Sequence, residues 1–322
     1  MSTDVPALDS SGDLTSSALA VRSRILESVP AQARAPIIRR VTALHELLQS
    51  SDRRGYAHLP AGVTAYWNQH LEDEHSGICL VVLLATLIAD MERMFAAKNL
   101  PPSIAAEACE QGWRILKRLS AKPGAKMSLT SDTFLKDLAI CRVEMFACGA
   151  TLAEPYGGPR RRLLVTTDLG GALGLLAALV RERGITTPYL SLHLHPPLLH
   201  AFNPAGWRRA YLLLAELLEW NPNLRGVLGG GWYCDPEMAR VSPHLTYIRE
   251  IAGEGGALFV RGPANEDDVR SATIAPGPRR EAFLAGRYRP TNYVMIWLRK
   301  DVLAWARSQA REGVGGKPIQ TP

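Results

Sequence analysis

The stretch "GVLGGGWYCDPEM", Gly226 to Met238, joins a short apolar run to three consecutive glycines and then to Trp232, Tyr233 and an Asp-Pro pair. Glycine has no Cβ, so a ligand or a second backbone can approach closely at such a strand end. Asp235 suits the cap of a short helical turn, and Pro236 suits its first position. The pattern predicts a strand that ends at a binding site, and a wide turn around a core tryptophan explains it equally well.

The residues around this stretch alternate between strand and helix patterns. Strands are predicted at 162–168, 188–195, 224–233 and 256–262, and a further one at 292–299. Helices are predicted at 169–184, 204–222 and 300–311. This order is typical of an α/β or α+β fold with at least one parallel strand pair.

The first half of the chain has a different texture, because residues 18–150 read as about five helices separated by proline and glycine. One predicted apolar stripe consists of Ile38, Val41, Leu44, Leu47 and Leu48. A Pro/Gly/Arg segment at 154–162 marks a boundary. We therefore predict an α+β protein with a disordered tail (1–17), a helical domain (18–153), an α/β domain (160–312) and a flexible tail (313–322).

Charge and cysteine content narrow the class of protein. The net charge is +6, and the part after residue 155 carries about +7, with 19 arginines among its 21 basic residues. Arginine grips carboxylate or phosphate groups, although a GC-rich genome would also favour arginine. Five cysteines without paired spacing and a polar, acidic N-terminus predict free thiols and a cytoplasmic location. No membrane segment and no nucleic-acid motif is recognised.

Two histidines, His193 and His195, occupy alternate positions of the predicted strand at 188–195. In a strand this spacing places both rings on one face, where one could serve as a general base or both could bind a metal ion. The competing interpretation is a half-buried strand whose outer face carries histidine.

The candidate binding residues form two groups. The first lies at the glycine-rich strand end, and the second is an Arg/Tyr segment that can grip an anionic group while stacking a planar one, or simply be solvated. The candidates are Gly229, Gly230, Gly231, Trp232, Tyr233, Asp235, Arg279, Arg280, Arg287, Tyr288, Arg289 and Tyr293.

A weaker alternative is a metal site at "HLEDEH", where His70, Glu72, Glu74 and His75 have helical spacing. Acidic residues at the start of a helix also complement its dipole. We predict no bound metal. The phosphate-loop, nucleophile-elbow and dinucleotide-binding motifs are absent from the sequence.

The "SLHLHPP" strand, the amphipathic helix after it and "GGGWYCDPEM" together resemble the GNAT-like C-terminal domains of bacterial acyltransferase-type proteins with a helical N-terminal domain. Trp232, Asp235 and Pro236 match the family's signature, and the resemblance covers roughly residues 187–240. It implies a splayed mixed sheet around an acyl-donor cleft, with His193 or His195 as the base. The family's CoA loop has no match, since "RGVLGGG" has the wrong spacing and precedes Trp-Tyr.

The missing loop favours a binding role over catalysis. We predict a cytoplasmic accessory protein that binds a peptide or small anionic ligand, and possible pathway proteins, without a cofactor, in a bacterial biosynthetic pathway. The alternatives are an acyl-CoA-dependent N-acyltransferase and, less favoured, a metal-dependent oxygenase.

Overall fold

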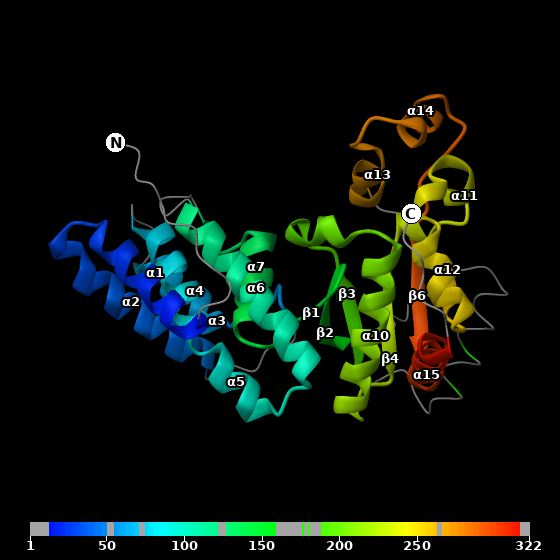
Figure 1. The fold of residues 1–322 in the computed structure, drawn as a ribbon. Coiled ribbons are helices and arrows are strands. Elements are labelled where there is room, and N and C mark those ends of the chain that lie inside the picture. Colours follow the sequence, from blue (N-terminus) through cyan, green and yellow to red (C-terminus); the bar gives the residue numbers. More distant parts are fainter. Residues whose placement is uncertain are drawn as a thin grey trace, which may run out of the picture. The chain divides into compact units, whose positions relative to one another are not determined.

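The computed structural model describes residues 13–49, 55–70, 75–121, 127–158, 188–262 and 266–315, together with Leu176 and Val180; for 312–315 it describes the backbone alone. The chain divides into two compact units, Met1–Ala147 and Cys148–Pro322, here called the helical unit and the sheet unit (Figure 1). Helices form the first and a six-stranded mixed sheet dominates the second. The predicted α+β class is confirmed.

The helical unit begins with α1 (Leu14–Glu27), four residues earlier than predicted. The earlier start has a local cause, since the Asp13 carboxylate accepts hydrogen bonds from the backbone N–H groups of Thr15 and Ser16. The next helix, α2, spans Ala31–Gln49 and buries Ile37, Val41, Leu44 and Leu48. Ile38, which was predicted to share this stripe, is 48% exposed, and Ile37 takes its place in the core.

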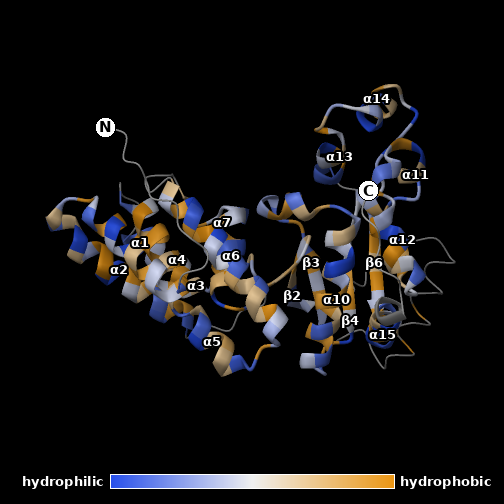
Figure 2. Ribbon diagram, viewed as in Figure 1, coloured by the Kyte–Doolittle hydropathy of each residue, from blue (hydrophilic) through white to orange (hydrophobic). Residues whose placement is uncertain are grey.

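The segment predicted as one long apolar helix forms two, α4 (Ser76–Ala89) and α5 (Met91–Lys98), which meet at Asp90. α4 is buried almost all round and packs against α1 and α2. Its residues are mostly hydrophobic (Figure 2). The remaining helices are α3 (Ala61–His70), α6 (Pro102–Ala121) and α7 (Asp132–Cys141). None of the helices within the described ranges is both long and apolar enough to cross a bilayer.

The region between the two predicted domains contains strands that the sequence patterns did not predict. α7 ends at Cys141, and β1 (Phe146–Cys148) and β2 (Thr151–Gly157) occupy residues predicted as a helix end and a linker. β2 pairs antiparallel with β3 (Tyr189–His193), and the register becomes irregular between Glu154 and Gly157. Pro155 lies within this irregularity, where its missing N–H costs no regular ladder bond.

The sheet has the order β1-β2-β3-β4-β6-β5. The predicted strands near 224–233, 256–262 and 292–299 are β4 (Gly226–Gly231), β5 (Leu258–Arg261) and β6 (Tyr293–Leu298). β3 and β4 are parallel, whereas β6 is antiparallel to both β4 and β5. The predicted strand 162–168 lies outside the described residues; of the predicted helix 169–184, only Leu176 and Val180 are described, and both are helical and exposed.

Three helices complete the core of the sheet unit: α10 (Pro204–Trp220), α12 (Tyr247–Glu254) and α15 (Arg299–Gly315). Tyr211 of α10 stacks edge-on against Trp297 of β6 and Trp305 of α15. The Tyr211 hydroxyl donates to the carbonyl of Ile248 on α12. These aromatic contacts fix α10, α12 and α15 against the face of the sheet that carries Trp297.

Shorter elements gather at one end of this sheet (Figure 1). Three follow β4 and lead into α12, namely η2 (Trp232–Cys234), α11 (Met238–Val241) and η3 (Pro243–Leu245). α13 (Glu266–Thr273) and α14 (Pro278–Leu284) lie between β5 and β6 in sequence. A small buried core at this end of the sheet consists of Met238, Val241, Ala282 and Tyr288.

Candidate functional site

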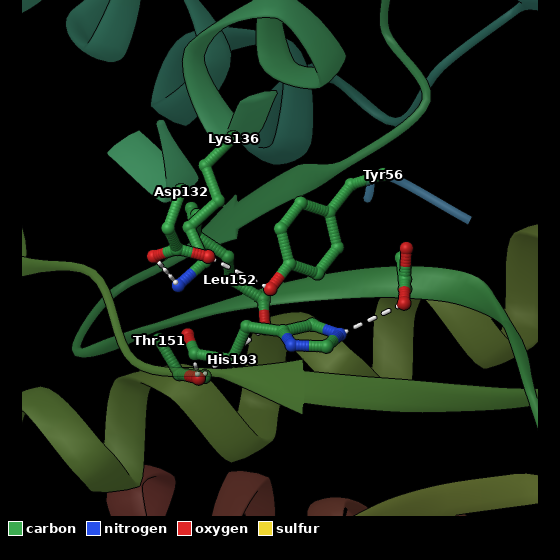
Figure 3. A network of polar contacts seen from close by, with 7 residues as sticks. Tyr56, Asp132, Lys136, Thr151, Leu152 and His193 are labelled. Carbon is green, nitrogen blue, oxygen red and sulfur yellow. Dashed lines mark hydrogen bonds and ion pairs between the residues drawn. The ribbon is translucent and has the colours of Figure 1, made fainter. Parts of the chain in front are cut away.

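A histidine and a carboxylate face each other across strands β2 and β3. The His193 Nε2 lies 2.9 Å from Glu154 Oε1, and the His193 side chain is shown in Figure 3. His193 is 23% exposed and Glu154 is 11% exposed. A carboxylate that accepts from Nε2–H holds the imidazole in the tautomer whose Nδ1 carries the lone pair. This geometry suits a general base with an orienting carboxylate.

Strand pairing places the two residues on one face of the sheet. Glu154 aligns with Ser191, and Leu152 aligns with His193, so Glu154 and His193 are diagonal neighbours. The Thr151 hydroxyl donates to the His193 carbonyl at 3.1 Å, which ties the two strands together at the same level (Figure 3).

His195, the other candidate base, lies just beyond β3 and precedes η1 (Pro196–Ala201). It is only 2% exposed. A base must reach the proton that it removes, so the structure favours His193 of the two.

The parallel strands beside His193 are aligned over a short distance. Leu190 aligns with Val227 and Ser191 with Leu228, which are the two aligned pairs of β3 and β4. β4 remains aligned with β6 as far as Gly231. Within the described residues, the aligned pairs of β3 and β4 end at Ser191 and Leu228, and the next residues, Leu192 and Gly229, remain close to each other. The carboxyl ends of these parallel strands form the edge at which ligands of such sheets usually bind.

The glycine triplet is largely explained by packing within the protein. A Cβ on Gly229 would lie 2.9 Å from Cδ1 of Leu192, and one on Gly230 would lie 2.1 Å from the Tyr293 carbonyl oxygen. Gly230 also has a φ of +132°, which residues with a side chain rarely adopt. The triplet thus admits neighbouring protein atoms, and a ligand is not needed to account for it.

Trp232 begins η2, so the predicted strand ends two residues early, and the expected strand alternation of Trp232 and Tyr233 does not apply. The guanidinium of Arg279 lies over the Trp232 ring, 4.2 Å from its centroid. Arg279 also donates to the Ala272 carbonyl and to the Ser242 hydroxyl. Its stacking and its donors therefore hold α14 against η2, α13 and the end of α11, and its predicted contact with an anionic ligand stays a prediction.

Asp235 connects two segments of the chain through hydrogen bonds. Its Oδ1 accepts from Glu237 N at 3.0 Å, and its Oδ2 accepts from Thr291 N at 3.2 Å. Burial raises the pKa of this carboxyl, against the opposing effect of the two backbone hydrogen bonds. Asp235 therefore closes the turn that leads into α11, whereas the N-cap residue of α11 itself is Glu237.

Tyr288 is 5% exposed in the small core beside Asp235. Burial, followed by the charge of Asp235, raises its pKa far above the usual range. Its hydroxyl lies close to that carboxylate without closing a hydrogen bond of normal geometry to any described residue. We therefore assign Tyr288 to packing.

The remaining arginines of the predicted binding segment point into solvent. Arg280, Arg287 and Arg289 are exposed, and their side chains form no ion pair within the described ranges. Tyr293 lies on β6 and contributes its ring to a different arginine, Arg249. The structure thus separates the predicted Arg/Tyr segment into a fixed part and an exposed part.

The predicted metal cluster is only partly described, because Glu72 and Glu74 lie outside the described residues. Elsewhere along the described chain, no three histidine, cysteine or acidic side chains gather closely enough to hold a metal ion.

The helix that follows the histidine-bearing strand is α10, and its N-terminus is already capped. Asn203 Oδ1 accepts from Gly206 N at 2.9 Å, and Pro204 has no N–H to offer. The Trp207 N–H bonds to the Asn203 carbonyl. A phosphate group could use few of the backbone donors that make helix N-termini anion sites.

Sequence reasoning missed two residues. Glu154 was assigned to the linker, and its role appears only when β2 pairs with β3. Arg249, on α12, stacks on Phe259 and Tyr293 from two other elements. No local pattern marks either residue.

Cys234 is 1% exposed, and burial raises the pKa of its thiol to about 12. We expect Cys234 to resist a maleimide reagent at neutral pH in the native protein, because the reactive thiolate is nearly absent. Peptide mass mapping should find Cys109, the half-buried thiol, labelled first among the described cysteines, and Cys234 labelled only after denaturation. Rapid labelling of native Cys234 would contradict this expectation.

Comparison with known proteins gives structural likeness alone. No protein-family model matches the chain, and no curated protein matches it. A solved acyltransferase in complex with decanoyl-CoA is 15% identical with a TM-score of 0.45, covering 89% of this chain and 88% of the other. Another acyltransferase, in complex with CoA and 10C-teicoplanin, is 12% identical with a TM-score of 0.47 and the same coverage. Likeness at this level carries no functional argument, so the GNAT-like resemblance stays a prediction.

Proposed function

We propose that the sheet unit transfers an acyl group from a thioester donor to an amine. The observation that carries this proposal is the Glu154–His193 pair, with its 2.9 Å contact, at the carboxyl end of β3, which is parallel to β4. A base at the carboxyl end of parallel strands is suitably placed to act on a ligand bound at that edge of the sheet. The binding role favoured by the sequence becomes the second candidate.

The chemistry requires only these groups and the two substrates. The amine nitrogen attacks the thioester carbonyl carbon, and an N–C bond replaces the C–S bond. His193 Nδ1 takes the proton that the amine loses, and Glu154 stabilises the resulting imidazolium through Nε2–H. The imidazolium then gives this proton to the departing thiolate, which leaves as a thiol, and His193 returns to its neutral form. No oxidant or reductant is needed.

The capped N-terminus of α10 affects how the thioester donor is expected to bind. Since Asn203 and Pro204 leave few backbone donors for a diphosphate, the thioester and its acyl chain are expected to contribute more to donor binding than the nucleotide. A donor with a short pantetheine thiol should then react nearly as well as the corresponding CoA ester.

The test is a turnover assay. Decanoyl-CoA and decanoyl-pantetheine would each be incubated with a panel of primary amines, with thiol release followed optically and amide products identified by mass spectrometry. We expect amide formation that depends on both substrates. Thiol release without amide, or no release with either donor, would reject the transferase. A strong preference for the CoA ester would reject the donor argument alone.

The second candidate is the binding of an acidic peptide or small anionic ligand, favoured by the exposed Arg280, Arg287 and Arg289 without ion-pair partners in the described structure. Substituting all three with glutamine should weaken capture of an acidic peptide by the full chain and leave thioester turnover unchanged. Arg270→Gln is a matched control, because Arg270 is exposed but paired with Asp267. Equal affinity in the triple variant would remove this candidate.

A further inference from the structure

A second site lies on the other side of β4 from His193. A pocket of about 230 Å³ opens where η2, α11 and α12 meet. Apolar atoms of Tyr233, Pro236, Met238 and Ala239 form part of its lining. Its volume lies below the range of pockets for drug-sized ligands, about 300–1,000 Å³, so it suits a ligand the size of an amino acid.

The pocket contains a rigid cation. The Arg249 guanidinium lies 4.3 Å from the Phe259 ring centroid and 5.4 Å from that of Tyr293. Its Nη1 donates to the Cys234 carbonyl at 2.7 Å. Across the described part of the chain, Arg249 forms no ion pair with a carboxylate within 4 Å. The stacked rings and the carbonyl fix the guanidinium in place, and the remaining N–H groups can bind a carboxylate in the pocket.

The same lining holds negative charge. Asp235 and Glu250 both contribute to the pocket. The two oxygens of Asp235 each accept one backbone N–H, and a carboxylate has lone pairs for further donors. Glu250 is exposed at the rim. One fixed cation, two carboxylates and an apolar wall match the charges and the side chain of a zwitterionic amino acid.

We infer that this pocket binds a free α-amino acid with an apolar side chain, its carboxylate on Arg249 and its ammonium group facing Asp235 and Glu250. Met238 and Pro236 would contact the side chain. The inference goes beyond the proposed acyl transfer and does not depend on it, because binding is measured without a thioester donor and the pocket shares no residue with the Glu154–His193 pair.

The experiment is an isothermal titration of the full chain with L-leucine and L-methionine. N-acetyl-L-leucine lacks the ammonium group, and L-leucinamide lacks the carboxylate. We expect saturable binding of at least one amino acid and at least about tenfold weaker binding of both blocked derivatives, since each loses a charge-assisted contact.

Three variants locate the site. Ala239→Trp fills the exposed mouth without touching Arg249, Arg249→Met removes the cation, and Arg270→Gln is the control at a remote exposed arginine. We expect the first two to abolish detectable binding and the control to bind normally. If Arg249→Met fails to fold, Ala239→Trp and Glu250→Gln decide the outcome. No heat at millimolar amino acid, or unchanged affinity in Ala239→Trp, would overturn the inference.

Discussion

Replacing His193 with alanine is expected to lower the rate of amide formation by a factor of about 10²–10⁴, the usual contribution of a general base. The physical reason is its 2.9 Å contact with Glu154, which orients the ring and stabilises its protonated form. The measurement is kcat with a thioester and an accepted amine. We expect the loss in kcat to exceed any change in KM, because the base acts on the bound amine.

Two further variants make this result interpretable. Glu154→Gln keeps the side-chain shape and removes the charge, so it should lower kcat by less than His193→Ala. His200→Ala is the matched control, since His200 is an exposed histidine on η1 whose Nδ1 lies 3.0 Å from the Pro197 carbonyl oxygen. Thermal unfolding should show that each variant keeps the native fold. A normal kcat in a folded His193→Ala variant would exclude His193 as the base.

Some elements of the fold follow from local sequence patterns, whereas others depend on contacts between residues that are distant in the sequence. The strands near 188–195 and 224–233, and the helix near 204–222, follow from alternation and helical periodicity, both of which are local. β2 could not be predicted, because residues 151–157 contain Pro155 and glycine and become a strand through pairing with β3. Glu154 therefore looked like part of a linker.

The candidate site shows the same division. His193 was found because its spacing is local, whereas its partner Glu154 lies on another strand. Arg279 was predicted to bind an anionic group because it lies in an arginine-rich segment. Its stacking on Trp232 and its hydrogen bond to Ser242 depend on the folded structure. An arginine-rich segment predicts a positively charged surface. Only the packing of the folded chain shows which of these arginines are already engaged in contacts within the protein.

In the helical unit, Arg118→Met is expected to destabilise the protein by about 3 kcal/mol, the lower end of the range for breaking a buried ion pair. Arg118 on α6 donates to Asp137 on α7, and the Asp137 side chain is fully buried. Arg118 itself is 35% exposed, so water can partly replace it, which places the effect at the low end. Urea unfolding followed by circular dichroism measures the change.

A double-variant cycle tests the cause of this loss. If the cost arises from an uncompensated carboxylate in the core, Asp137→Leu combined with Arg118→Met should recover most of the stability. The control is Arg114→Met, one turn earlier on α6, whose pair with Glu110 is more exposed and should contribute less than about 1 kcal/mol. Equal losses in Arg118→Met and Arg114→Met, or no recovery in the double variant, would show that the α6–α7 contact depends on apolar packing rather than on this pair.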